Sequence, residues 1–187
     1  MNKITVKKAN RSLFQKLMSL DYTHVAHGMF GIRRDGKTLK LTELKLRKQK
    51  NDRSKVYTTL RDRYINELKD RNVYALVALY DGEPGGYLFT YKQKWPGGTV
   101  YSIDGILVAK QFAGKGLAKA LLKEIIKKAK STKNCRGIAV EMDTEKFAAS
   151  KLLQKMGFAF AGAKLFVYSN REPHKFSKEA IYFFYKI

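Results

Sequence analysis

The chain has 187 residues, 44% of them hydrophobic, so it can bury a core, and disorder of the whole chain is excluded. Lys and Arg number 38 against 16 Asp and Glu, and a net charge of +22 attracts polyanions such as nucleic acid or a phosphorylated cofactor, unless it only reflects a generally solvated surface. One cysteine excludes an internal disulfide framework, and no apolar run is long enough for a membrane span or a signal core. We therefore expect one domain over residues 1–187 in the cytoplasm, away from the membrane.

The first third of the chain predicts short elements around one hairpin. Apolar and polar residues alternate on both sides of Asp35-Gly36, which is a hairpin turn signal. The elements expected here are a strand at Ile4–Lys8, a helix at Ser12–Ser19, and hairpin strands at Met29–Arg33 and Leu39–Leu44. Apolar residues at four-residue spacing then predict an amphipathic helix over Asp52–Arg71.

The middle of the chain predicts an antiparallel meander. Apolar segments rich in β-formers alternate there with turns rich in glycine and proline. The expected strands are Val73–Tyr80, Tyr87–Trp95 and Thr99–Val108, with turns at Asp81–Gly86 and Pro96–Gly98.

After Val108 the pattern changes to helix and strand in alternation. A helix from Gly116 to near Ser131 has one apolar face and one lysine-rich face. The later elements expected are a strand at Ile138–Met142, a helix at Lys146–Met156 ended by Gly157, and strands at Phe158–Tyr168 and Ala180–Lys186. A meander followed by a strand–helix–strand unit predicts a mixed α/β fold, in which that unit forms a parallel pair.

A glycine-rich segment joins the third meander strand to the following helix. Its residues are Gln111, Phe112, Ala113, Gly114, Lys115 and Gly116. Glycines let backbone N–H groups converge, and with a helix N-terminus behind them these groups form a nest for an anion such as a pyrophosphate. The spacing fits neither a Walker loop nor a dinucleotide-binding fingerprint, and a simple turn into a helix remains the alternative.

The context of this segment resembles the acetyl-CoA-binding motif of the GNAT acetyltransferase superfamily. That motif reads R/Q-x-x-G-x-G/A, and Gln111, Gly114 and Gly116 match it. Ala149–Phe158 is similar to a second signature of the family, a helix ending in Gly-Phe. From about residue 28 onward, the order of short motifs resembles the streptothricin acetyltransferase group in particular. These motifs are Thr42-Glu43-Leu44 within Gly31–Leu44, Lys94-Trp95, Glu141, and Lys178-Glu179-Ala180 followed by Phe184-Tyr185.

The resemblance implies a GNAT fold whose cosubstrate is acetyl-CoA. Its pantetheine would pair with the third meander strand, its pyrophosphate would lie on the amides of residues 111–117, and an amine would attack the thioester without a covalent intermediate. The cofactor-binding residues expected from the resemblance are Ile106, Leu107, Val108, Gln111, Phe112, Ala113, Gly114, Lys115, Gly116, Leu117, Ala118, Lys146 and Ser150.

The catalytic residues are expected on the same resemblance. Asp104 aligns with a frequent general base of the family, although a strand-end carboxylate bonded to a neighbour is the alternative. Many relatives have a tyrosine as general acid where this chain has Leu153, and Tyr168 is the substitute that we expect. Lys146 replaces a cofactor-contacting asparagine and is either a phosphate partner or a solvated lysine. Ser150 either donates a hydrogen bond or lies on a helix surface.

The acceptor remains open between several classes. A small amine, including an aminated antibiotic, follows from the resemblance, provided that carboxylates such as Glu43, Asp104, Glu141 and Asp143 make the site locally acidic. The alternatives are acetylation of a protein amino group and a non-catalytic module that binds CoA or nucleic acid through its basic surface. The three histidines lack ligand spacing, so no metal is expected, and a homodimer is the common state of the family.

Overall fold

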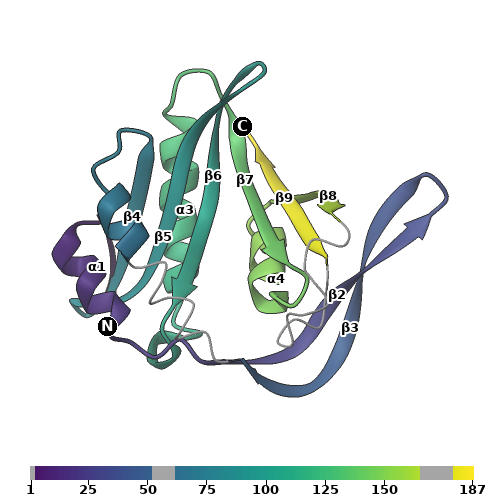
Figure 1. Ribbon diagram of the computed structural model, residues 1–187, viewed down its shortest axis with the longest axis horizontal. Coiled ribbons are helices and arrows are strands. Elements are labelled where there is room, and N and C mark those ends of the chain that lie inside the picture. Colours follow the sequence, from purple (N-terminus) through teal and green to yellow (C-terminus); the bar gives the residue numbers. More distant parts are fainter. Residues whose placement is uncertain (1–2, 52–61, 165–178) are drawn as a thin grey trace. The chain divides into compact units, whose positions relative to one another are not determined.

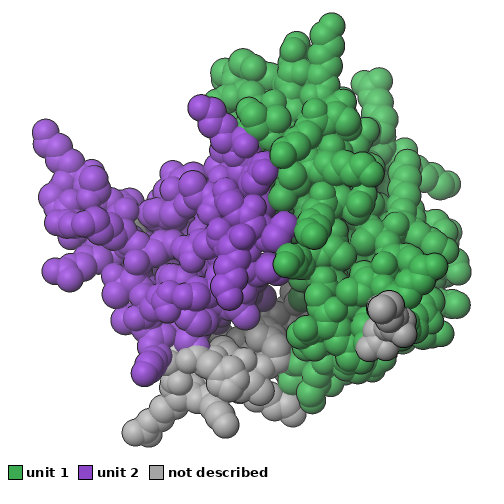
Figure 2. Space-filling model, turned by 180° about the vertical axis from the view of Figure 1, so that it is seen from behind, with its two compact units in different colours: residues 1–24, 52–138, 187 green, residues 25–51, 139–186 purple. Residues whose placement is uncertain are grey.

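A computed structural model describes residues 3–51, 62–164 and 179–187 of the chain. The chain divides into two compact units, which Figure 2 shows in different colours. Unit 1 comprises residues 1–24, 52–138 and 187, and unit 2 comprises residues 25–51 and 139–186. The fold is mixed α/β, with a mostly antiparallel sheet that contains one parallel pair, as the sequence predicted.

Unit 1 contains the predicted meander (Figure 1). Its strands are β1 (Ile4–Lys8), β4 (Val73–Tyr80), β5 (Glu83–Trp95) and β6 (Gly98–Val108), and they are hydrogen-bonded in this order. Every one of these pairings is antiparallel. The expected ranges of β1, β4 and β6 are confirmed to within one residue.

Helices cover the strands of unit 1 because alternate strand residues point to opposite faces. Helix α1 (Arg11–Met18) is capped by Asn10, whose side chain accepts from the Leu13 amide. Its Phe14 and Leu17 join a core formed by alternate residues of β4 and β5, together with Tyr64. Helix α3 (Leu117–Lys130) buries its apolar face, as its periodicity predicted.

Unit 2 contains the remaining strands and one helix. Strand β7 (Cys135–Asp143) starts in unit 1 and continues in unit 2, and helix α4 (Phe147–Lys155) follows it. Strands β8 (Ala159–Lys164) and β9 (Ala180–Lys186) pair antiparallel. The hairpin β2 (His24–Asp35) and β3 (Thr38–Asn51) forms a separate two-stranded sheet, which confirms the turn predicted at Asp35-Gly36.

Two sequence predictions need correction or restriction. The expected turn at Asp81–Gly86 was wrong beyond Gly82, because β5 already begins at Glu83. Gly85 and Gly86 are buried residues of this strand. A Cβ at Gly86 would lie 2.8 Å from the Leu107 carbonyl oxygen of the adjacent strand β6. Of the helix expected over 52–71, residues 62–67 are helical, and residues 52–61 lie outside the described part of the chain.

Candidate functional site

The glycine-rich segment of unit 1 is an exposed loop held by buried anchors. Strand β6 ends at Val108, a 3-10 turn spans Lys110–Phe112, and α3 begins at Leu117. Phe112 and Leu117 are buried, with 8% and 1% of their surface exposed, whereas residues 113–116 are exposed. The sequence therefore places apolar anchors at both ends of a polar, glycine-containing loop.

Both motif glycines adopt backbone conformations that other residues seldom take. Gly114 has φ +75° and Gly116, the N-cap of α3, has φ +91°. This region is strained for residues that carry a Cβ, so glycine is the residue that allows the turn. A Cβ at Gly114 would have nothing within 4 Å, which shows that the loop requires this residue for its backbone and not for space.

The loop presents backbone donors. The amides of Ala113 and Lys115 are used within the loop, donating to Lys110 and Phe112 at 3.1 and 3.3 Å. Within the described residues, the N–H groups of Gly114, Gly116 and Leu117 have no acceptor. Because these donors lie at the positive end of the α3 dipole, they can bind an anion.

The strand that leads into this loop is partly accessible. Ile106, Leu107 and Val108 are half-buried and pair along one edge with Leu88, Tyr87 and Gly86 of β5. Gly85, next to that pairing, lies so close to the loop that a Cβ there would be 2.6 Å from the Phe112 ring and 2.7 Å from Leu117. The two anchors of the loop are thus seated against a glycine of β5.

Asp104 stands at an irregularity of β6. Phe89 of β5 pairs with Gly105 and the next residue, Thr90, pairs with Ile103, so Asp104 is the extra residue of a β-bulge. Bulges bend a strand and redirect a side chain. The side chain of Asp104 is 30% exposed, which leaves its carboxylate reachable from solvent.

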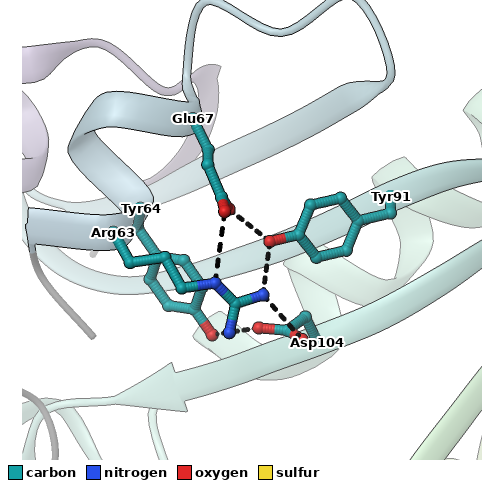
Figure 3. Close-up of polar contacts among 5 residues, drawn as sticks. All are labelled: Arg63, Tyr64, Glu67, Tyr91 and Asp104. Atoms are coloured by element: carbon teal, nitrogen blue, oxygen red, sulfur yellow. Dashed lines mark hydrogen bonds and ion pairs between the residues drawn. The ribbon is translucent and has the colours of Figure 1, made fainter. Parts of the chain in front are cut away.

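Asp104 belongs to a polar network of five residues in unit 1 (Figure 3). Its Oδ2 accepts from the Tyr64 hydroxyl at 2.7 Å, and its Oδ1 lies 3.5 Å from Nη2 of Arg63. Arg63 also donates from Nη2 to the Tyr91 hydroxyl at 2.6 Å and from Nε to Glu67 at 3.2 Å. The Tyr91 hydroxyl donates to the second oxygen of Glu67. The helical residues 62–67 are thereby joined to β5 and β6.

The two phenols of this network stay protonated over the physiological range. Burial, and then the hydrogen bond to Asp104, raises the pKa of Tyr64 above its ordinary value. Burial, and then the hydrogen bond to Glu67, raises the pKa of Tyr91 to about 12. Burial lowers the pKa of Arg63, but the bond to Tyr91 and the charge of Asp104 outweigh it, so that the pKa is raised overall. The site therefore holds neutral donors and a permanent cation beside two carboxylates.

Three predicted positions belong to unit 2. Lys146 is the N-cap residue of α4. Ser150 is fully buried and its hydroxyl contacts the Met142 sulfur at 3.1 Å, so the alternative of a helix-surface serine is wrong. Leu153, in the place of the usual tyrosine, is buried. Tyr168 lies outside the described residues, and its role stays a prediction.

The carboxylates expected to make the site acidic have different partners. Glu43 forms an ion pair with Lys151. Glu141 accepts a hydrogen bond from Tyr182, and this bond adds to the effect of burial in raising the pKa of that phenol. Glu43, Glu141 and Asp143 are residues of unit 2, while Asp104 is a residue of unit 1.

Sequence reasoning missed the partners of Asp104. In the sequence, Tyr64 falls among the apolar residues of the helix predicted over 52–71, and Tyr91 falls within the strand predicted at Tyr87–Trp95. The i,i+4 pair of Arg63 and Glu67 was a detectable signal, since it joins a cation and an anion on one helix face. Nothing in the local sequence signalled that this pair meets Asp104, which lies 41 residues after Arg63.

The described residues contain neither a candidate metal site nor a candidate membrane-spanning helix. No group of three or more His, Cys, Asp or Glu side chains among them has an arrangement that could hold a metal ion. None of the helices in the described ranges is both long and apolar enough to cross a membrane.

Known proteins resemble this chain in sequence. The model of the acetyltransferase (GNAT) family matches residues 38–158. A streptothricin acetyltransferase of Escherichia coli is 34% identical over 84 residues, which cover 45% of this chain and 47% of that protein. The match thus spans about half the length of that curated relative.

Solved structures resemble the chain over nearly its whole length. A protein of Bacillus anthracis, assigned as a streptothricin acetyltransferase and crystallised with acetyl coenzyme A, has a TM-score of 0.79 at 18% identity, covering 99% of this chain and 98% of the other. A nourseothricin acetyltransferase has a TM-score of 0.73 at 17% identity, covering 98% of each chain. At these identities the likeness establishes the fold.

Proposed function

The chain belongs to the GNAT acetyltransferase family, and from this premise we propose that it transfers an acetyl group from acetyl-CoA directly to an amine of a small molecule. The observation that carries the proposal is the loop of residues 113–116. Its two glycines have positive φ, and their amides, at the start of α3, have no acceptor in the described part of the chain. The family model extends over residues of both units, which supports treating 1–187 as one domain. We place the enzyme in the cytoplasm.

In the proposed complex, the loop holds the pyrophosphate of acetyl-CoA. The amides of Gly114, Gly116 and Leu117 donate to phosphate oxygens, and the α3 dipole contributes about 0.3–1 kcal/mol per favourable charge. Ile106–Val108 provides a strand edge for the pantetheine amides. Lys146 is retained as a proposed cofactor contact, whereas the buried Ser150 would support the site indirectly by fixing α4.

The reaction needs a base for the acceptor ammonium and a proton for the leaving thiolate. We assign the base role to Asp104, whose carboxylate is partly exposed on the bulge of β6. The neutral amine attacks the thioester carbonyl carbon, and the nitrogen of the tetrahedral adduct loses its second proton to water. The adduct then collapses with cleavage of the C–S bond to give the amide and the CoA thiolate. The thiolate takes its proton from Tyr168 or from water, because the buried Leu153 has no proton to donate.

The acceptor that we propose is a cationic amine of the antibiotic type. The relatives named as streptothricin and nourseothricin acetyltransferases point to that class of substrate. In unit 1 the network around Asp104 holds two carboxylates and one guanidinium, so its local charge is negative although the whole chain carries +22. A local negative charge favours an ammonium group.

The first test is thermal unfolding with acetyl-CoA, CoA and ATP, followed by an amine screen that includes streptothricin. A ligand at 100 times its Kd stabilises the folded state by about 2.7 kcal/mol. We expect acetyl-CoA and CoA to raise Tm and ATP to have little effect. Equal shifts with all three would mean that the positive charge alone binds phosphate, and no shift would refute the cofactor site.

A basic surface favours a second candidate, binding of nucleic acid. Helix α3 has six charged residues, five lysines and Glu124. Gel shift at increasing salt tests this candidate, since binding through phosphates falls steeply with salt concentration. The same preparations, studied by sedimentation, would establish whether the enzyme is a homodimer.

A further inference from the structure

Tyr64 has a contact that its role in the core does not require. It is 1% exposed and its ring stacks on Phe89, with centroids 4.1 Å apart and an interplanar angle of 16°. Phe14 and Tyr87 meet the same ring edge-on. These contacts fix the ring, so the position of the hydroxyl is fixed as well. That hydroxyl is aimed at Asp104 Oδ2, at 2.7 Å.

The backbone of β6 makes room for this hydroxyl. A Cβ at Gly105 would lie 2.8 Å from the Tyr64 hydroxyl oxygen and 3.3 Å from the Tyr87 ring. A residue with a side chain at this position would therefore displace the hydroxyl. The bulge at Asp104 and the glycine after it together bring carboxylate and phenol into contact.

The bond leaves the two oxygens of Asp104 in different situations. Oδ2 accepts from a neutral phenol, while the partner of Oδ1 among the described residues is the Arg63 guanidinium, at the longer distance of 3.5 Å. Arg63 is held elsewhere by Tyr91 and Glu67, and its guanidinium lies 5.7 Å from the ring centroids of Tyr64 and Tyr91 (Figure 3). Oδ1 is thus the oxygen that remains available to an incoming ammonium group.

We propose that Tyr64 is a positioning residue for the acetyl transfer: it holds Asp104 by Oδ2 so that Oδ1 receives the proton of the acceptor amine. The inference rests on the proposed function, because it needs Asp104 as the base. A donor to a carboxylate favours the charged form, and that form is the one that accepts a proton. The charged and titratable groups around Asp104 in the described residues are Arg63, Tyr64, Glu67 and Tyr91.

The test is Tyr64→Phe, which keeps the ring and removes only the hydroxyl. We expect kcat to fall by roughly 10- to 100-fold, the range for a hydrogen bond to a charged group, with little change in KM for acetyl-CoA. The acid limb of the kcat/KM profile should move toward higher pH, because the Tyr64 hydroxyl no longer donates to the base. A residue with only a structural role would lower Tm and leave this profile in place.

The matched control is Tyr101→Phe. Tyr101 is another buried tyrosine of unit 1, 2% exposed, and its hydroxyl bonds Thr132 at 3.0 Å. Its loss should lower stability without moving the pH profile. If Tyr64→Phe folds poorly, Gly105→Ala disturbs the same contact from β6, where its Cβ would lie 2.8 Å from the Tyr64 hydroxyl oxygen, and should shift the profile in the same direction.

The outcomes distinguish failure of the proposed acetyl transfer from failure of the role assigned to Tyr64. A wild-type chain that binds no acetyl-CoA and acetylates no amine would overturn the function and the inference together. An active wild type whose Tyr64→Phe variant has the kcat and pH profile of Tyr101→Phe would overturn the role of Tyr64 and leave the function standing.

Discussion

The seating of the loop on Gly85 gives a sharp prediction, because Gly85 itself is not expected to touch the cofactor. Changing Gly85 to Ala would place a Cβ 2.6 Å from Cδ2 of the Phe112 ring and 2.7 Å from Cδ2 of Leu117. Both neighbours are buried anchors of the loop, so neither can turn aside without moving it. We expect Gly85→Ala to weaken acetyl-CoA binding from outside the site.

The magnitude follows from overpacking. One extra methyl group in a packed region costs about 1–3 kcal/mol, and in a chain of this size each kcal/mol lowers Tm by roughly 2–4 °C. A loop displaced enough to lose about 1.4 kcal/mol of anion binding raises the Kd for acetyl-CoA tenfold. Thermal unfolding and isothermal calorimetry measure these two quantities separately.

A double-mutant cycle identifies the cause. Phe112→Ala removes the ring atoms that Gly85→Ala would strike, so Gly85→Ala should cost at least about 1 kcal/mol less in that background. Gly114→Ala is the matched control: it has φ +75° and no atom within 4 Å of its Cβ, so it should cost about 1–2 kcal/mol of backbone strain with no coupling to Phe112. A Gly85→Ala variant with wild-type Tm and affinity, or one equally costly in both backgrounds, would refute the reasoning.

Two further predictions concern the polar network. Asp104→Asn keeps an acceptor for Tyr64 and should lower kcat/KM by about 10²- to 10⁴-fold while acetyl-CoA still binds by calorimetry; full activity would remove Asp104 as the base. The pKa of Tyr91, raised to about 12 from 10.0, favours the folded state below pH 10, and this contribution is lost as pH rises towards 12. Urea unfolding at pH 9 to 12 should therefore show the stability advantage of wild type over Tyr91→Phe shrinking, and a constant difference would contradict it.

The loop and the helix behind it were predictable because their signals are local. Gly114 and Gly116 mark positive-φ positions within three residues of each other, and the apolar periodicity of α3 needs only its own 14 residues. The start of β5 was not predictable from local signals, because it depends on contacts with residues distant in the sequence. Gly85 and Gly86 are typical turn residues, yet they are strand residues here because Phe112, Leu117 and the Leu107 carbonyl come too close for a side chain.

The network around Asp104 was beyond sequence reasoning for a different reason. Tyr64 and Asp104 are 40 residues apart, and their contact depends on which residue of β6 is the bulged one. A shift of one residue would turn Asp104 to the other face of the strand. The sequence identified the carboxylate through a family resemblance, but the phenol that holds it is visible only once the register is known.

The net charge of the chain and the charge around Asp104 lead to different expectations for the acceptor. The net charge of +22 speaks against a cationic acceptor if it is taken as a property of the whole surface. At physiological salt, however, exposed lysines farther away than the Debye length of about 8 Å are largely screened. Within the described residues, an ammonium group that approaches Asp104 meets one guanidinium, which also binds Glu67, and two neutral phenols. The approach of the acceptor is then governed by the carboxylates of this network, so the positive surface and a cationic substrate are compatible.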